Sequence, residues 1–109
     1  MISKKNLKEI SGKVDKPYDN FLLDTVNDHC LRIAVMEEEY RWHYHENTDE
    51  LFIVLEGELK IEIKDQDTVF LKSSEIVKIP AKTIHKTSAV TRTVNLTFEK
   101  NAEDTVFMG

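Results

Sequence analysis

Short strand-like segments that follow one another closely constrain the fold of this chain more than any other feature of its sequence. The clearest is ELKIEIK (58–64), in which Leu59, Ile61 and Ile63 alternate with charged residues. Successive side chains of a strand point to opposite faces, so this alternation predicts a half-buried strand with one solvated face. The other expected strands are 21–26, 30–36, 40–45, 51–56, 68–72, 75–80, 83–89 and 92–100. They recur at roughly 8–12 residues without a longer helical pattern, and such spacing predicts an all-β sandwich or barrel.

The length of the chain, 109 residues and 12.7 kDa, corresponds to one domain with a core of its own. Residues 1–16 are rich in lysine and are expected to form a solvated arm with a short strand or helix turn at residues 6–10. No repeat, low-complexity stretch or Pro/Gly-rich linker divides the remainder. We therefore interpret residues 1–109 as a single domain.

Charge and apolar patterning argue against several classes of partner. The formal net charge is −5, which disfavours a sequence-independent grip on nucleic acid and attraction to anionic membranes. The longest apolar run, residues 51–55, is far shorter than the roughly 20 residues of a membrane-spanning helix, and the N-terminus lacks the apolar segment of a secretory signal. The single cysteine, Cys30, excludes an internal disulfide and is expected to be a small buried core residue. Together these features favour a cytoplasmic protein.

Two histidines and a glutamate stand close together in WHYHENTDELFIVLEG (42–57). His43 and His45 are two residues apart, so on a strand both imidazoles face the same side. The polar residues 46–49 predict a turn, after which Glu50 opens the next strand and can reach back toward the histidines. Imidazole nitrogen and carboxylate oxygen are a ligand set for Mn, Fe, Ni, Co or Zn. A bare H-x-H also fits two histidines on a solvated strand face, but the glutamate at hairpin distance favours a metal site.

In its spacing, this stretch resembles the first motif of the cupin family, which runs H-x-H, three or four residues, Glu, six residues, Gly. The matching residues are His43, His45, Glu50 and Gly57. PAKTIH (80–85) resembles the second cupin motif, P-x-G-x-x-H, and supplies His85. The resemblance covers roughly residues 30–98, and it implies a double-stranded β-helix (jelly-roll) barrel. It also implies that His43, His45, Glu50 and His85 hold one divalent transition metal inside that barrel.

Several glycines of the family pattern are replaced in this chain, whereas all four ligand positions are intact. Glu37 stands six residues before the first histidine of the motif, Ser74 six residues before Pro80, and Lys82 between Pro80 and His85. Glycine serves at such turns because it tolerates unusual φ angles. Loss of glycines with retention of every ligand favours a working metal site.

The residues around the histidines set expectations for the cavity and for assembly. Alternation places Arg41 on the side of His43, where its guanidinium could bind a carboxylate or phosphate of a substrate, or could turn outward at the barrel mouth. Phe52 shares a face with Glu50 and is expected to form an apolar wall of the substrate site. The other aromatic side chains here, expected on the outer face, are Tyr40, Trp42 and Tyr44. With the resemblance to small cupins, this aromatic face predicts a homodimer.

The resemblance leaves the reaction open. Small single-domain cupins resembling this one are often described as phosphomannose-isomerase-like, while other cupins are dioxygenases, decarboxylases or epimerases. The sequence shows no acid–base pair beyond the ligands. A metal-dependent isomerase and a dioxygenase, acting on a sugar, a sugar phosphate or an organic acid, are therefore equal hypotheses. The alternatives are a non-catalytic barrel that binds or senses a small molecule, and a storage barrel without metal.

Overall fold

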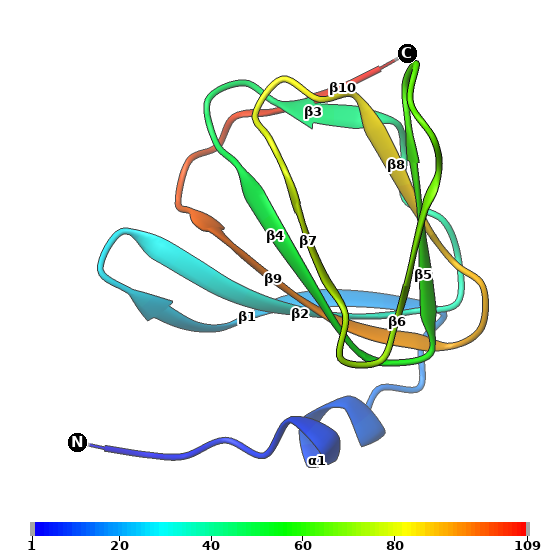
Figure 1. Cartoon of the computed structure of the whole chain (residues 1–109). Helices are drawn as coiled ribbons and strands as arrows, with labels where there is room; N and C mark the ends of the chain where they lie inside the picture. Colours follow the sequence, from blue (N-terminus) through cyan, green and yellow to red (C-terminus); the bar gives the residue numbers. More distant parts are fainter. Residues whose placement is uncertain (1, 109) are drawn as a thin grey trace.

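Residues 2–108 of the computed structural model form two antiparallel five-stranded sheets that face one another as an open barrel (Figure 1). The first sheet contains, in spatial order, β1 (Tyr18–Val26), β2 (His29–Met36), β9 (Thr93–Lys100), β4 (Glu50–Glu56) and β7 (Ile76–Ile79). The second contains β10 (Thr105–Phe107), β3 (His43–His45), β8 (His85–Ala89), β5 (Glu58–Ile63) and β6 (Val69–Lys72). The predicted all-β barrel is therefore confirmed.

From β3 onward, the chain changes sheet at almost every connection, and these crossings close the barrel. Gly57 makes the crossing from β4 to β5. Its φ angle is +81°, and a Cβ atom at this position would lie 2.3 Å from the carbonyl oxygen of Arg92. A residue with a side chain would both strain the backbone and clash, so this crossing requires glycine.

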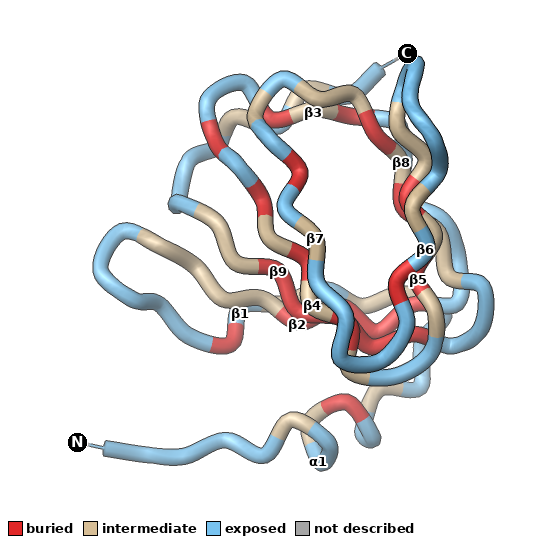
Figure 2. The backbone as a smooth tube through the Cα atoms, in the orientation of Figure 1, coloured by how far each residue is buried: buried red, intermediate tan, exposed pale blue. Residues whose placement is uncertain are grey.

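Alternation along the strands of the first sheet distributes its apolar side chains between two clusters, one on each face, and the second sheet adds residues to the inner one. Figure 2 shows buried positions on the strands of both sheets. The inner cluster, between the sheets, consists of Met36, Phe52, Val54, Leu59, Ile61, Leu71 and Ile79. The outer cluster consists of Leu23, Ile33, Val35, Val94 and Leu96. Each face of this sheet therefore packs against an apolar cluster. The inner face also carries polar residues beside its apolar ones.

The outer cluster is covered by a short helix, α1 (Leu7–Gly12). The side-chain oxygen of Asn6 accepts a hydrogen bond from the backbone N–H of Glu9 at 3.0 Å and caps this helix. Leu7 and Ile10, one turn apart, pack against the cluster. A helix turn was one of the two alternatives expected at residues 6–10, and α1 confirms it. The expectation that this segment is solvated is wrong, because Leu7 and Ile10 pack on the sheet.

Several strand boundaries differ from those predicted, and two differences bear on the site. β3 begins at His43 rather than at residue 40, so residues 40–42 do not share its alternation. β10, which pairs with β3, was not predicted. Cys30 also differs from the prediction, because it is half-buried rather than part of the core.

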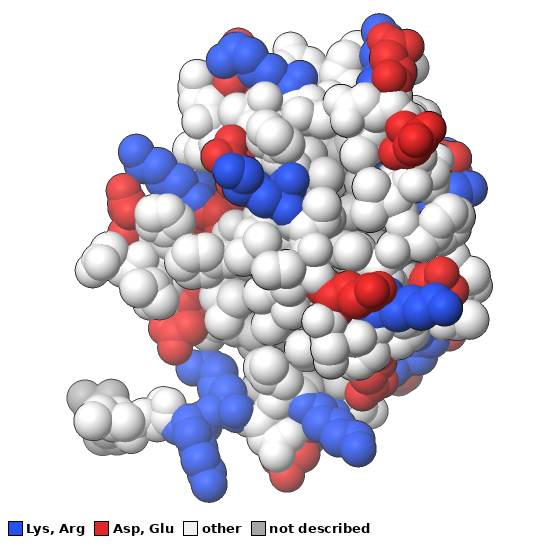
Figure 3. All heavy atoms as spheres, viewed as in Figure 1, with Lys and Arg blue, Asp and Glu red and all other residues white. Residues whose placement is uncertain are grey.

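The surface shown in Figure 3 carries Lys and Arg interspersed with Asp and Glu rather than in one continuous basic area. Within residues 2–108, no helix combines the length and the apolar character needed to cross a bilayer.

Candidate metal centre

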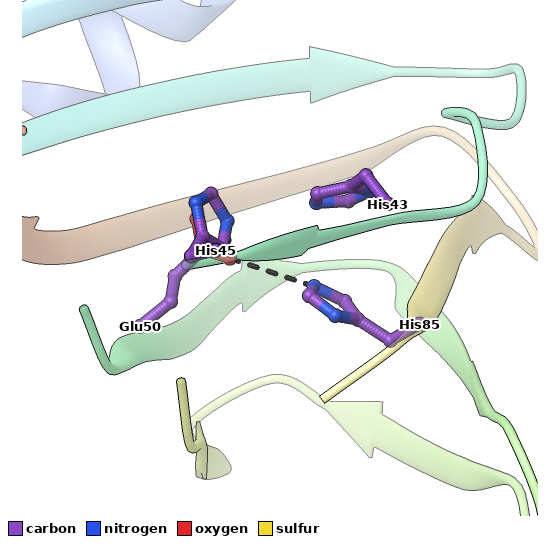
Figure 4. A group of neighbouring side chains, drawn as sticks. All are labelled: His43, His45, Glu50 and His85. Carbon is purple, nitrogen blue, oxygen red and sulfur yellow. Dashed lines mark hydrogen bonds and ion pairs between the residues drawn. The ribbon is translucent and has the colours of Figure 1, made fainter. Parts of the chain in front are cut away.

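Four buried side chains from the two sheets converge at one place in the barrel (Figure 4). His43 and His45 come from β3, and His85 comes from β8, where it lies directly opposite His43 in the strand pairing. Glu50 approaches from the first sheet as the first residue of β4. Each residue offers one nitrogen or oxygen atom, and these four atoms lie within 4.8 Å of one another. The four positions predicted as metal ligands thus lie together in the structure.

Backbone carbonyls hold two of the imidazoles in one orientation. The Nδ1 atom of His43 lies 2.7 Å from the carbonyl oxygen of Arg41, and the Nδ1 atom of His85 lies 2.8 Å from that of Thr83. A carbonyl can only accept, so each Nδ1 is the protonated nitrogen that donates. The Nε2 atom of each ring consequently carries a lone pair and faces the cluster.

Outer contacts orient His45 in a different way. Its Nδ1 atom lies 3.2 Å from the hydroxyl of Thr105 and 3.6 Å from a carboxylate oxygen of Asp104. Asp104 is itself fixed, because it accepts hydrogen bonds from the backbone N–H of Asn47 at 2.8 Å and the hydroxyl of Thr48 at 3.0 Å. Such outer partners fix the ring orientation of metal-binding histidines and raise their basicity.

The ionisation of the cluster suits a cation. Burial lowers the pKa of His43 to about 4, so this ring is neutral at physiological pH. Burial also raises the pKa of Glu50, but the hydrogen bond to His45 and the nearby ring of His85 outweigh that effect and hold the pKa at about 2. The site therefore combines a buried carboxylate with neutral imidazole nitrogen, the donor set of divalent transition metals.

One nitrogen atom of the cluster is buried without a hydrogen-bond partner among the described residues. The Nε2 atom of His85 is buried and has no hydrogen-bond partner in the described part of the chain, and it lies 3.6 Å from the Glu50 carboxylate. Buried polar atoms are normally paired because leaving one unpaired costs about 1–3 kcal/mol. A metal ion would accept this lone pair and neutralise the carboxylate together. The residues present therefore fit a bound divalent cation.

The cluster opens onto a cavity of about 370 Å³ between the sheets. Apolar lining is provided by Ala34, Met36 and Phe52, and the polar lining includes Asn20, Arg32, Thr87, Asn95, Thr97 and Glu99. Phe52 lies where the sequence predicted an apolar wall, and its ring meets that of His85 edge to face at 6.2 Å between centroids.

Arg41 takes the outward alternative that the sequence left open, whereas Tyr40 lies elsewhere than the alternation predicted. The guanidinium of Arg41 stacks over the ring of Phe107 at 4.4 Å, and Arg41 is exposed and does not line the cavity. Tyr40, expected on the outer face, lines the cavity and stacks on Tyr18. Both placements have one cause, because β3 begins only at His43 and the two-residue period does not extend back to residues 40–42.

Other polar residues of the site were not identified from the sequence. Glu99 and Arg32 line the cavity, and Asp104 and Thr105 lie behind His45. Burial, and then the Glu50 carboxylate, raise the pKa of Glu99 to about 7. Glu99 follows from the register of the first sheet, in which it pairs with Glu50. No local pattern in the sequence reveals that register.

The fold and the buried His-His-Glu-His cluster define a cupin-type barrel with a candidate metal centre. The cupin domain model matches residues 31–98, and the chain belongs to this family. The chain is 46% identical over 108 residues to the uncharacterized protein YdbB of Bacillus subtilis (strain 168), covering 99% of this chain and 96% of that protein.

Solved structures agree on the fold. The crystal structure of a cupin-2 domain containing protein from Shewanella frigidimarina NCIMB 400 matches with a TM-score of 0.82 at 29% identity, covering 89% of this chain and 94% of that one. Protein NMB1881 from Neisseria meningitidis matches with a TM-score of 0.81 at 15% identity, covering 91% of this chain and 100% of that one. The predicted double-stranded β-helix is therefore confirmed.

Proposed function

We propose that this chain is a metal-dependent cupin in which His43, His45, Glu50 and His85 hold one divalent ion, Mn, Fe, Ni, Co or Zn. The observation that carries the proposal is the buried Nε2 atom of His85, which faces three other ligand-type groups and has no partner among the described residues. A bound ion of this kind supplies Lewis-acid or redox chemistry to an oxygen atom of a substrate.

The ligand is a small oxygen-bearing metabolite, such as a sugar, a sugar phosphate or an organic acid. Support comes from the cavity of about 370 Å³ beside the cluster, which offers hydroxyl, amide and charged side chains along with the apolar wall at Phe52. This support does not distinguish a phosphomannose-isomerase-like activity from a dioxygenase-like one.

One feature favours proton transfer, as in an isomerase. Glu99 lines the cavity, lies outside the four-residue cluster, and sits 4.0 Å from the Nδ1 atom of His45. Its carboxyl group can hold or release a proton close to the bound substrate, which is the task of a general acid–base residue. Turnover of a bound metabolite would support the enzyme hypothesis. Binding without turnover would support a non-catalytic binding or sensor barrel.

Elemental analysis of the untagged protein, purified without added metal, tests the metal centre. We expect about one transition metal per chain for the wild type. His85→Ala should reduce metal affinity by roughly 10-fold or more, because an outer partner alone contributes about that much and His85 offers its lone pair directly. His29→Ala is the matched control, since His29 pairs with Asp28 at the surface. A wild-type protein that is empty and cannot be loaded would contradict the proposal.

We further propose that the chain forms a homodimer. The support is a group of exposed apolar side chains beside β3 and β10, consisting of Trp42, Phe107 and Met108. These residues are adjacent in the structure, because the backbone N–H of Met108 donates to the carbonyl of Trp42 at 2.9 Å. Light scattering should give twice the chain mass, and a monomer at all concentrations would contradict the assignment.

A further inference from the structure

The polar part of the cavity wall has no role in the proposed metal centre. It lies on the inner face of the first sheet, where Arg32 of β2 pairs with Thr97 of β9 and Ala34 of β2 pairs with Asn95 of β9. All four residues line the cavity. The question is what these polar groups recognise.

Asn95 is the most informative of them. Its side chain is 2% exposed, and its Oδ1 atom has no hydrogen-bond partner in the described part of the chain. Its neighbours across the sheet are Ala34 on one side and Val54 on the other, and neither side chain can form a hydrogen bond. Burial of the amide oxygen without a hydrogen bond costs free energy of folding. Asn95 lines the cavity, so a ligand there could reach this oxygen. A ligand hydroxyl would satisfy it.

Arg32 supplies a positive charge at the same wall. Its Nε–H donates to the side-chain oxygen of Asn20 at 2.8 Å, and its Nη2 donates to the backbone carbonyl of Asn20 at 3.3 Å. Both acceptors are neutral, and no carboxylate of residues 2–108 lies within 4.0 Å of the guanidinium. Asn20 therefore holds the guanidinium in place and leaves its remaining N–H groups for another acceptor. The charge of Arg32 also opposes the rise in the pKa of Glu99, which lines the same cavity. An arginine fixed in this way suits bidentate recognition of an oxyanion.

We propose that Arg32 and Asn95 form a subsite for a small hydroxylated oxyanion, with the carboxylate or phosphate of the ligand on Arg32 and a ligand hydroxyl on the Asn95 amide. The proposal rests on the proposed function in one respect, since the far end of the same ligand would reach the metal centre. It narrows the substrate class to hydroxy-acids and sugar phosphates and leaves out neutral sugars. In this arrangement Asn20 is a positioning residue, because it acts through Arg32.

Three probes with the same three-carbon frame test the subsite by isothermal titration calorimetry. Glycerate carries a carboxylate, glycerol 3-phosphate carries a phosphate, and glycerol carries neither. The wild type should bind at least one of the two anions roughly 10-fold or more tightly than glycerol, as expected for a hydrogen-bonded charge pair. Preference for glycerate identifies a carboxylate ligand, and preference for glycerol 3-phosphate identifies a phosphate. Equal affinity for all three probes would overturn the proposal.

Arg32→Gln is the decisive variant, and Lys72→Gln is its matched control. Both lose one positive charge, but Lys72 is an exposed residue of β6. Arg32→Gln should reduce the preference for the anion to about 3-fold or less, and Lys72→Gln should leave it unchanged. A preference that survives in Arg32→Gln would overturn the proposal.

The titrations are made on both the zinc-loaded and the metal-free protein, which separates this subsite from the metal centre. If elemental analysis and loading find no metal, the proposed metal centre fails. An Arg32-dependent preference in the metal-free protein would still support the subsite. If metal binds stoichiometrically while Arg32→Gln changes nothing, the subsite fails and the metal centre stands.

Asn95→Leu tests the hydroxyl contact. It replaces a buried amide whose oxygen has no partner among the described residues by an apolar group, so the melting temperature of the metal-free protein should not fall. The affinity for all three probes should fall by roughly 5-fold, because each has hydroxyls to donate. Wild-type affinity in Asn95→Leu would exclude this amide from the subsite.

Discussion

Four of the described residues other than glycine have a positive φ angle, and two of these replace a glycine of the cupin motifs. Ser74 and Lys82 stand where the family pattern has glycine, and their φ angles are +74° and +68°. Left-handed backbone costs a non-glycine residue about 1 kcal/mol or more. These two turns therefore have the left-handed backbone conformation that glycine adopts without strain, although neither residue is glycine. The expectation of glycine-like backbone geometry is thus correct for Ser74 and Lys82 and wrong for Glu37, whose φ angle is not positive.

Ser74→Gly should therefore stabilise the protein. Ser74 is exposed, so little besides the backbone strain changes when its side chain is removed. We expect a gain of up to roughly 1 kcal/mol in the free energy of unfolding, measured by urea denaturation. Ser73→Gly is the control. Its hydroxyl donates to the carbonyl of Leu55 at 2.8 Å and its φ is not positive, so that variant should be destabilised. Equal losses in both variants would refute this explanation.

At the scale of strands, the sequence predicted what depends on local alternation and missed what depends on pairing at long range. ELKIEIK became β5 with Leu59 and Ile61 fully buried, as its alternation indicated. The same argument failed for Arg41, because an aromatic run looks like a strand while the pairing with β10 covers only residues 43–45. β10 is three residues long and pairs with a strand some sixty positions earlier. Alternation within so short a segment cannot predict such a pairing.

The candidate site divides in the same way. His43, His45, Glu50 and His85 could be named because motif spacing is written along the chain. Arg32 and Asn95 could not, because they reach the cavity through the register of β2 and β9. Whether a polar residue of a strand faces the interior follows from its neighbours in the sheet rather than from its neighbours in the sequence.

β10 has a consequence for the candidate metal centre, because it brings Thr105 to the outer nitrogen of His45. Thr105→Val keeps the shape of the side chain and removes only the hydroxyl. We expect roughly a 10-fold loss of zinc affinity, by competition with a chelating dye, with little change in the stability of the metal-free protein. Thr105→Ser restores the hydroxyl and should recover most of the affinity. If Thr105→Val binds zinc as the wild type does, His45 is oriented by Asp104 instead.

The whole molecule consists of two sheets, and the proposed ligands come from both. Glu50 belongs to the first sheet and the three histidines to the second. A cation held by all four would connect the sheets in the folded state and would lose those contacts on unfolding. Metal binding should therefore stabilise the entire barrel rather than one loop, as in other proteins where a metal site forms only in the fold.

We expect added zinc to raise the melting temperature of the wild-type protein and a chelator to reverse the rise. At a free metal concentration 100 times the dissociation constant, the gain is about 2.7 kcal/mol in the free energy of unfolding. Glu50→Gln should lose most of this response, because it removes the charged ligand of the first sheet while preserving its shape. Glu56→Gln, at the exposed end of the same strand, should respond like the wild type. Equal stabilisation of Glu50→Gln and wild type would mean that zinc binds without Glu50, and the two sheets would then not be joined through this site.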